Sequence, residues 1–298
     1  MSRAKRQHFV PRFYLKNFAH SSSSLFSYDK TNDSVVETNV NDIALGKNFY
    51  ELEGLENGLI EKSLSKNENK FSNAYHELIE EKEISKLSQE SVTHFFFFMA
   101  LQILRTLNHR LDLQNALSKA YDKMFSQIAN DFLKKKGSRL AGHVRVSPDP
   151  EEAKLMQIEM IIETVPLFAR ILAAKRWWIN ENFHDVPFWT SDSPVVLYNE
   201  VNRELRMGNL GLLSPGIEIH FPLTKDLRLV SYDLNTHLFK RNMLGRFERM
   251  HVIWENTLQL MDSSRFVYAP SDNDFERAKK FLSDYPQFRN RMQRMNVY

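Results

Sequence analysis

The chain has 298 residues, 42% of them apolar and 26% charged, a composition typical of a soluble globular protein. It contains no cysteine, which excludes disulfide bonds, thiolate zinc sites, iron–sulfur clusters and a cysteine nucleophile. The longest apolar run, residues 95–104, is about half as long as the roughly 20 residues that a membrane-spanning helix needs. We therefore expect a cytoplasmic protein with no membrane partner.

The net charge of +3 is small, but the basic residues are grouped. They gather in residues 1–16, 134–145 and 277–294. Basic clusters can attract nucleic acid by neutralising its phosphates, so nucleic acid is a candidate partner. The alternative is a set of solvated surface side chains with no partner.

The first half of the chain reads as a short hairpin followed by helices. Residues 25–38 contain two β-prone runs around a polar turn. Apolar residues at helical spacing then predict helices over residues 55–83, 88–135 and 149–175. We expect a break near residues 108–113, and Pro166 should kink or divide the third helix.

From residue 176 onward the apolar period changes to that of strands. Strands are predicted at residues 177–179, 186–190, 195–198, 217–223, 227–232 and 265–268, and helices at 245–261 and 272–294. This order predicts an α+β fold in which the helical middle segment packs against a mainly antiparallel sheet. The sheet would be formed by the C-terminal half and the N-terminal hairpin. We expect one domain over residues 1–298; the alternative is a boundary near residue 146.

Three acidic or basic side chains near the N-terminus could carry chemistry. His8 lies in an extended, aromatic-rich segment. It could act as a general base or metal ligand, or it could be a half-buried structural histidine. Glu61 and Glu68 are seven residues apart, which places them on one helix face about 10 Å from each other. They could face a cleft and hold a cation together with another ligand, or simply flank an apolar stripe.

Arg105 is a charge within the apolar face of its helix, and a buried charge is costly unless it is paired. We expect it to meet a carboxylate of Glu61, Glu68 or Asp192, or to bind an oxyanion or phosphate. Asp192 lies in a turn between two predicted strands. It could bind a cation or orient a histidine there, or cap the turn with its own side chain.

His220 alternates with apolar residues in a predicted strand and is expected on the polar side of the sheet. There are nine glycines and no Gly-rich phosphate loop, so no nucleotide cofactor is expected. Haem and iron–sulfur cofactors are not expected either.

Several short signatures together resemble a bacterial family known as domain of unknown function 4238, over nearly the full length. The signatures are Gln7-His8-Phe9-Val10-Pro11-Arg12-Phe13-Tyr14-Leu15, Asn48-Phe49-Tyr50, Ile60-Glu61 with Glu68, Gln102-x-x-Arg105-Thr106 with Arg110, Thr190-Ser191-Asp192-x-Pro194-Val195, Phe221-Pro222-Leu223 and Asn256. Leu107 stands where the family pattern has proline. The family has no assigned activity, so the resemblance implies which residues matter without implying a mechanism.

The favoured hypothesis is a metal-dependent phosphodiesterase or nuclease, a hydrolase suited to a role such as phage defence. Its catalytic residues would be His8, Arg105 and Asp192, its substrate-binding residues Arg12, Gln102 and Arg110, and its Mg²⁺ or Mn²⁺ ligands Glu61, Glu68 and Asp192. This hypothesis requires His8, Glu61, Glu68, Arg105 and Asp192 to converge within about 8–10 Å. The alternative is a non-catalytic module that binds nucleic acid or protein, in which the same polar residues form a buried structural network.

Overall fold

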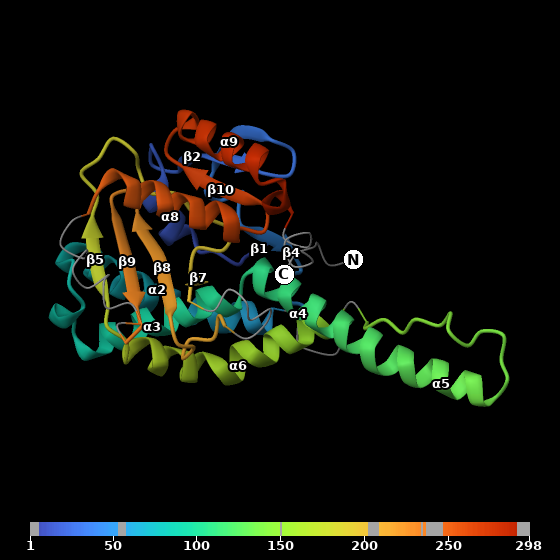
Figure 1. Cartoon of the computed structure of the whole chain (residues 1–298). Helices are drawn as coiled ribbons and strands as arrows, with labels where there is room; N and C mark the ends of the chain where they lie inside the picture. Colours follow the sequence, from blue (N-terminus) through green and yellow to red (C-terminus); the bar gives the residue numbers. More distant parts are fainter. Residues whose placement is uncertain are drawn as a thin grey trace.

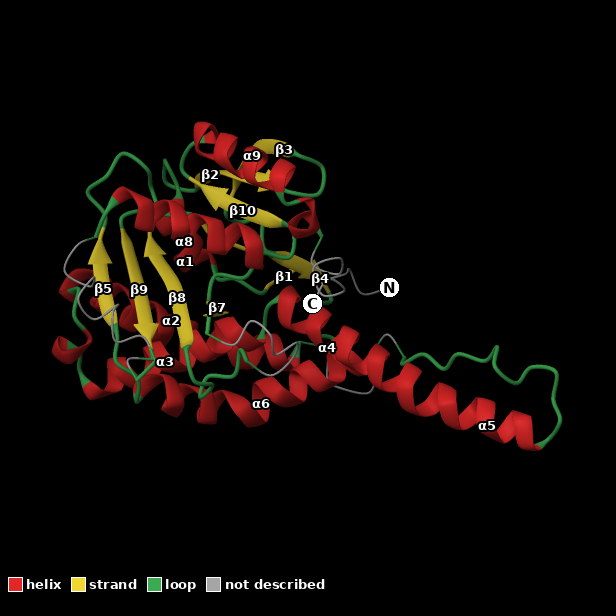
Figure 2. Cartoon of the chain, in the orientation of Figure 1, coloured by secondary structure: helices red, strands yellow, loops and turns green. Residues whose placement is uncertain are grey.

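The computed structural model describes residues 6–52, 58–149, 151–201, 209–233, 235–236 and 247–290, and the fold is α+β as expected (Figures 1 and 2). Its helices are α1 (Arg12–Leu15), α2 (Leu59–Glu81), α3 (Gln89–Leu104), α4 (Leu107–Ala120), α5 (Gln127–Lys135), α6 (Glu152–Ala173), α8 (Arg249–Asp262) and α9 (Glu276–Asp284). Its strands are β1 (Arg6–His8), β2 (Ser24–Asp29), β3 (Ser34–Asn39), β4 (Leu45–Lys47), β5 (Trp178–Glu181), β6 (Thr190–Ser191), β7 (Val196–Asn199), β8 (Ile217–Thr224), β9 (Leu227–Tyr232) and β10 (Phe266–Ala269). None of the helices in the described ranges is long and apolar enough to cross a membrane.

The strands form three antiparallel sheets rather than the single sheet that we predicted. The hairpin β2–β3 joins the C-terminal strand β10, as expected, in a sheet of order β3-β2-β10-β6. A second sheet has the order β5-β9-β8-β7, and β1 pairs with β4 alone. The chain leaves the first sheet after Ser191 and enters the second at Val196. Pro194 lies between them and has no N–H group with which to continue a ladder.

The sheet β5-β9-β8-β7 lies between helix α8 and the layer formed by α2, α3 and α6 (Figure 1). Apolar and polar residues alternate along β8 and face these two sides. Ile219 and Phe221 of β8 face the helical layer, where the Phe221 ring stacks on Tyr14 with a centroid distance of 5.3 Å. Glu218 and His220, at the intervening positions, face α8. The period of two in a strand thus separates an aromatic core from a polar layer.

The long helical stretch breaks at Arg105 and Thr106, so the predicted break near residues 108–113 was wrong. Thr106 begins α4 as its N-cap, with its hydroxyl accepting a hydrogen bond from His109 N. Threonine is favoured at the N-cap position because its hydroxyl accepts a hydrogen bond from a backbone N–H group in the first turn of the helix.

Helix α6 continues through Pro166, which neither divides nor ends it. Proline removes one backbone hydrogen bond, to the carbonyl of Ile162. The Ile162 side chain is on the exposed face of the helix, where water can hydrate that carbonyl.

Two other element predictions were longer than the observed elements. Of the predicted strand 186–190, only Thr190 belongs to a strand, because Asn256 of α8 takes the backbone hydrogen bonds of Pro187 and Trp189. The last helix ends at Asp284, before Pro286 begins a short 3-10 turn. Residues 291–294 of that prediction lie outside the described residues.

Candidate functional site

The site is built around the short ribbon β1–β4 and the segment that follows it. Gln7 of β1 is buried, and its Oε1 accepts a hydrogen bond of 2.8 Å from Tyr50 N. Its Nε2 donates to Glu51 Oε1 at 2.9 Å and to Glu61 Oε2 at 3.1 Å. One amide therefore joins the N-terminal strand, the Tyr50 segment and the first turn of α2.

Arg105, the C-cap of α3, is 7% exposed. With the Gln102 amide turned so that its oxygen faces the guanidinium, Arg105 Nε and Nη2 both donate to that oxygen at 2.6 Å. Glu68 acts on Arg105 electrostatically, but no carboxylate of the described residues lies within the 4.0 Å of a salt bridge. Burial lowers the pKa of Arg105, with Tyr50 and Glu68 opposing the shift. The expected ion pair is thus replaced by a neutral amide, which leaves the positive charge without a contacting anion.

Tyr50 is 4% exposed, and its hydroxyl makes no hydrogen bond with the described residues. Burial raises the pKa of Tyr50 to about 12, while the positive charges of Arg105 and Arg110 act in the opposite direction and Glu61 adds to the rise. At neutral pH this group is a phenol, a hydrogen-bond donor held beside two cations.

Arg110 lies in the first half of α4 and is fixed by three contacts. Its Nε donates to Gln157 Oε1 at 2.7 Å, its Nη2 donates to Phe49 O at 2.8 Å, and its guanidinium carbon lies 3.7 Å from the Phe49 ring centroid. Burial lowers the pKa of Arg110 to about 10. Arg110 therefore holds the Phe49–Tyr50 backbone against α4, which positions the Tyr50 side chain.

His8 and Arg12 border this cluster. His8 Nε2 is buried and has no hydrogen-bond partner among the described residues. Burial lowers the pKa of His8, and the charges of Arg12, Arg6 and Arg105 lower it further. Arg12 is exposed and donates from Nη1 to Asn41 Oδ1 at 3.2 Å. At neutral pH His8 is therefore an uncharged imidazole within the field of several arginines.

Among the residues predicted for the nuclease site, Asp192 alone makes its hydrogen bonds in another part of the molecule. Its carboxylate accepts hydrogen bonds from the backbone N–H groups of Ser264, Arg265 and Phe266 and from the Ser264 hydroxyl. These four donors attach the turn after β6 to the start of β10. The carboxylate is thus used by the protein itself, as in the turn-capping alternative.

The remaining sequence-selected residues gather around Tyr50. Hydrogen bonds or electrostatic interactions connect His8, Arg12, Glu61, Glu68, Gln102, Arg105 and Arg110 to it or to one another. Across the described part of the chain, no group of three or more His, Asp or Glu side chains is placed to hold a metal ion. The cluster is therefore richer in donors than in anionic ligands.

Sequence reasoning did not select three of the residues that hold the cluster together. Gln7, Tyr50 and Gln157 are amides or a phenol, which titration and charge patterns do not reveal. Gln157 is fully buried and donates to the carbonyls of Leu104 and Thr106, where α3 gives way to α4. Gln7 and Tyr50 belong to the family signatures and adjoin His8 and Phe49, so membership of a signature could have identified them.

A family model described as "Protein of unknown function (DUF4238)" matches residues 6–273. The chain belongs to this family. Comparison with curated proteins and with solved structures gave no match. The DUF4238 match covers all of the Tyr50 cluster, Asp192 and Asn256.

A second polar cluster of this DUF4238 chain lies between the sheet and α8. His220 Nδ1 lies 2.9 Å from Glu255 Oε1, and His220 Nε2 lies 3.3 Å from Glu218 Oε2. Arg228 also pairs with Glu255, and its Nε donates to Asn180 Oδ1 at 3.0 Å. Among the described residues, both ring nitrogens of His220 face carboxylate oxygens, and Arg228 pairs with one of these carboxylates. His220 thus lies on the polar side of the sheet, as its alternation indicated.

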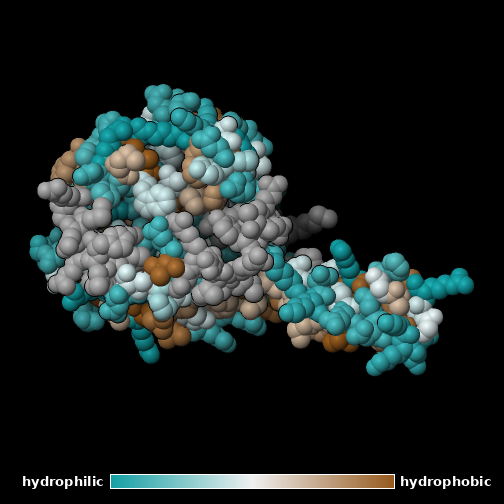
Figure 3. Space-filling model, viewed as in Figure 1, coloured by the Kyte–Doolittle hydropathy of each residue, from teal (hydrophilic) through white to brown (hydrophobic). Residues whose placement is uncertain are grey.

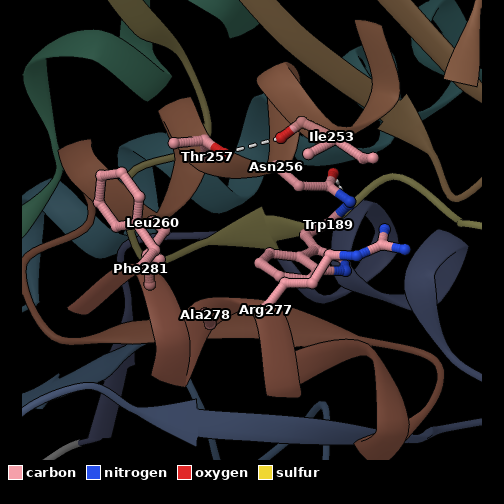
Figure 4. Close-up of a pocket in the computed structure, with 8 residues that line it drawn as sticks. All are labelled: Trp189, Ile253, Asn256, Thr257, Leu260, Arg277, Ala278 and Phe281. Carbon is pink, nitrogen blue, oxygen red and sulfur yellow. Dashed lines mark hydrogen bonds between the residues drawn. The ribbon is translucent and has the colours of Figure 1, made fainter. Parts of the chain in front are cut away.

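The DUF4238 chain also has a small pocket between α8 and α9, which is separate from both clusters (Figure 4). Its lining residues are Trp189, Ile253, Asn256, Thr257, Leu260, Arg277, Ala278 and Phe281. Asn256 uses its amide to hold the backbone at Pro187 and Trp189. Its role here is to fix the chain next to the Asp192 turn.

Proposed function

We propose that the protein hydrolyses phosphodiesters of nucleic acid and that the Tyr50 cluster receives the phosphate. The observation that supports this most is the environment of the Arg105 guanidinium. Among the described residues this buried guanidinium contacts only a neutral amide, which leaves N–H groups for an oxyanion, and Arg binds phosphate through such paired donors. The Tyr50 hydroxyl beside it is a further donor that the described residues leave unused.

The protonation states suit this chemistry. His8 is uncharged at neutral pH because burial lowers its pKa, so it can accept a proton from the attacking water. The water oxygen bonds to phosphorus and the P–O bond to the leaving oxygen breaks, while Arg105 and Tyr50 stabilise the negative charge on the phosphoryl oxygens. The proton that His8 took from the water then passes to the leaving oxygen. Arg12 and Arg110 add positive charge around the same place.

A divalent cation is part of the proposal. Mg²⁺ commonly binds through one or two carboxylates together with phosphate oxygens of the substrate. Glu61 acts electrostatically on Tyr50 and Glu68 on Arg105, and the two are about 10 Å apart along α2, so either carboxylate would hold the ion together with phosphate oxygens of the substrate. Phosphate oxygens of the nucleic acid would be the remaining ligands. This proposal drops Asp192 from the five residues that the sequence-based hypothesis required to converge, because its carboxylate is hydrogen-bonded to residues 264–266.

The experiment is an incubation of the purified protein with single- and double-stranded DNA and RNA, in Mg²⁺, Mn²⁺ or EDTA. We expect metal-dependent cleavage that falls at least about 100-fold in Arg105→Lys, His8→Gln and Tyr50→Phe, since each removes a group from the transition state. Tyr285→Phe, at an exposed tyrosine far from the cluster in sequence, is the matched control and should keep full activity. Folding of each variant is checked by thermal unfolding.

The second candidate is a non-catalytic binding module, and the amide-rich network favours it. Gln7, Gln102 and Gln157 are buried and bonded within the protein, as structural residues are. If the wild type binds nucleic acid but does not cleave it, and Arg105→Lys weakens that binding, the protein is a binder. If it neither cleaves nor binds, the cluster is structural.

A further inference from the structure

One part of the molecule projects from the body as an arm. It consists of the end of α4, the π-helical turn Tyr121–Ser126, α5 and the returning segment 136–149 (Figure 1). An extended arm buries little of its surface against the core of its own chain. The residues that it exposes therefore indicate the kind of surface that it contacts.

The polar face of the arm is the one that its own chain covers. Asn130 Oδ1 accepts hydrogen bonds from Gly142 N and Val144 N, and Asn130 Nδ2 donates to Val144 O. Ser126 Oγ accepts from Val146 N at 2.8 Å. The returning segment is therefore attached to the helix through polar side chains.

The opposite face of the arm is apolar and exposed. Phe125, Ile128 and Phe132, at positions i, i+3 and i+7, are 46%, 62% and 59% exposed, and Met124 beside them is 56% exposed. A solvated helix normally turns polar residues outward and buries the stripe of this spacing. Here the pattern is inverted, which indicates a partner that covers the stripe.

A second exposed apolar surface lies on the outer side of α6. Leu155, Met156, Ile162 and Leu167 are 40–61% exposed. At 100° per residue, Glu159 and Glu163 fall between them on the same outer face. Figure 3 shows hydrophobic surface along the lower edge of the body and on the lower side of the arm.

We propose that the protein forms a two-fold dimer in which the arm of one copy lies on α6 of the other. The charges are complementary, because the arm ends in the exposed Lys134, Lys135 and Lys136 and α6 carries the exposed Glu159 and Glu163. A two-fold axis makes the contact twice, since each copy has both surfaces. The exposed apolar residues of the arm then contact those of α6, and the lysines at the end of the arm lie against Glu159 and Glu163.

The area is sufficient for a stable dimer. Eight apolar side chains, each with about half of its roughly 200 Å² exposed, bury about 800 Å² in one contact and about 1,600 Å² in the two contacts, the size of a standard interface. A lipid surface suits the occupant less well, because anionic headgroups would repel the glutamates between the apolar residues of α6.

The first test is the mass of the full chain in solution, by sedimentation or light scattering at micromolar concentration. We expect a dimer, and we expect Phe132→Glu and Ile162→Glu each to weaken it at least about tenfold. Both side chains are exposed, so the thermal midpoint of the monomer should not fall. A monomeric wild type, or a dimer that neither substitution weakens, overturns the proposal. Monomer that binds phosphatidylserine vesicles through Phe132 overturns it in favour of a lipid surface.

Charge reversal separates this dimer from any other. The variants Lys134→Glu/Lys135→Glu and Glu159→Lys/Glu163→Lys should each be monomeric alone. Their mixture should form heterodimers, because both contacts then pair opposite charges. Failure of the mixture to associate overturns the arm-to-α6 geometry.

A covalent test is also available because the natural chain has no cysteine. Mixed Phe132→Cys and Ile162→Cys proteins should form a disulfide between unlike chains. The matched mixture of Phe183→Cys and Ile162→Cys, with an exposed residue outside the arm and α6, should not.

Discussion

The side-chain oxygen of Gln7 accepts a hydrogen bond from the backbone N–H of Tyr50 at 2.8 Å, across 43 positions of sequence. The same glutamine donates to Glu61 at the start of α2. This one amide fixes the Tyr50 backbone relative to α2. It explains how a three-residue strand at the N-terminus can organise a cluster of buried polar groups.

Replacing Tyr50 tests whether its hydroxyl serves the fold. Since this hydroxyl has no hydrogen-bond partner among the described residues, Tyr50→Phe should change the free energy of unfolding by less than about 0.5 kcal/mol. Tyr14→Phe is the matched control, because the Tyr14 hydroxyl donates to Pro222 O at 2.8 Å and lies 2.7 Å from Thr190 Oγ1. We expect that control to lose about 1–2 kcal/mol. Urea denaturation measures both, and an equal loss in the two variants would show that Tyr50 is structural.

Asp192 should contribute to stability. Asp192→Asn weakens hydrogen bonds from four donors to a buried carboxylate, so we expect a loss of about 2–4 kcal/mol. Asp185→Asn, at an exposed aspartate paired with Arg249, should have little effect. EDTA should not change the thermal midpoint of either protein. A stable Asp192→Asn protein that no longer responds to Mg²⁺ would instead restore the metal-ligand hypothesis.

His8 predicts a dependence of stability on pH. Burial and the neighbouring arginines lower the pKa of His8 in the folded state below the 6.5 of an unfolded chain. Between these two values the unfolded state binds more protons. The contribution of His8 is therefore fully present above pH 6.5 and is lost as the pH falls through the lowered value. The difference in free energy of unfolding between the wild type and His8→Gln should follow this course, and a constant difference across that range would refute it.

The cluster around Glu255 predicts strong coupling between Arg228 and its partner. Arg228→Met leaves the buried Glu255 carboxylate without its arginine partner, which should cost about 3–5 kcal/mol. Adding Glu255→Leu removes that carboxylate as well, so the double variant should be more stable than the sum of the two single losses indicates. A double-mutant cycle measures this coupling. Additive losses would show that the two side chains do not act as a pair.

Much of the fold was contained in the sequence because it depends on local patterns. The helical spacing in residues 55–83 and the alternation in residues 217–223 predicted α2 and β8, and the hairpin was expected to join a C-terminal strand. One error came where a distant side chain competes with local preference, and another where a local helix cap was missed. Asn256 takes the backbone bonds of Pro187 and Trp189, and Thr106 caps α4 earlier than the predicted break.

The sequence by itself determined the chemical character of the candidate residues, including a buried arginine and a histidine beside Gln7. Only the tertiary structure decided which of these groups are satisfied. Asp192 and Arg105 look alike in sequence as buried charges, yet among the described residues four donors surround the first and a single neutral amide contacts the second. That difference depends on backbone N–H groups and amides brought from 72 or more positions away for Asp192, and from three positions away for Arg105. The satisfaction of Asp192 follows from no local pattern, because its donors lie on a segment that only folding brings close, whereas the Gln102 partner of Arg105 lies about one helical turn away.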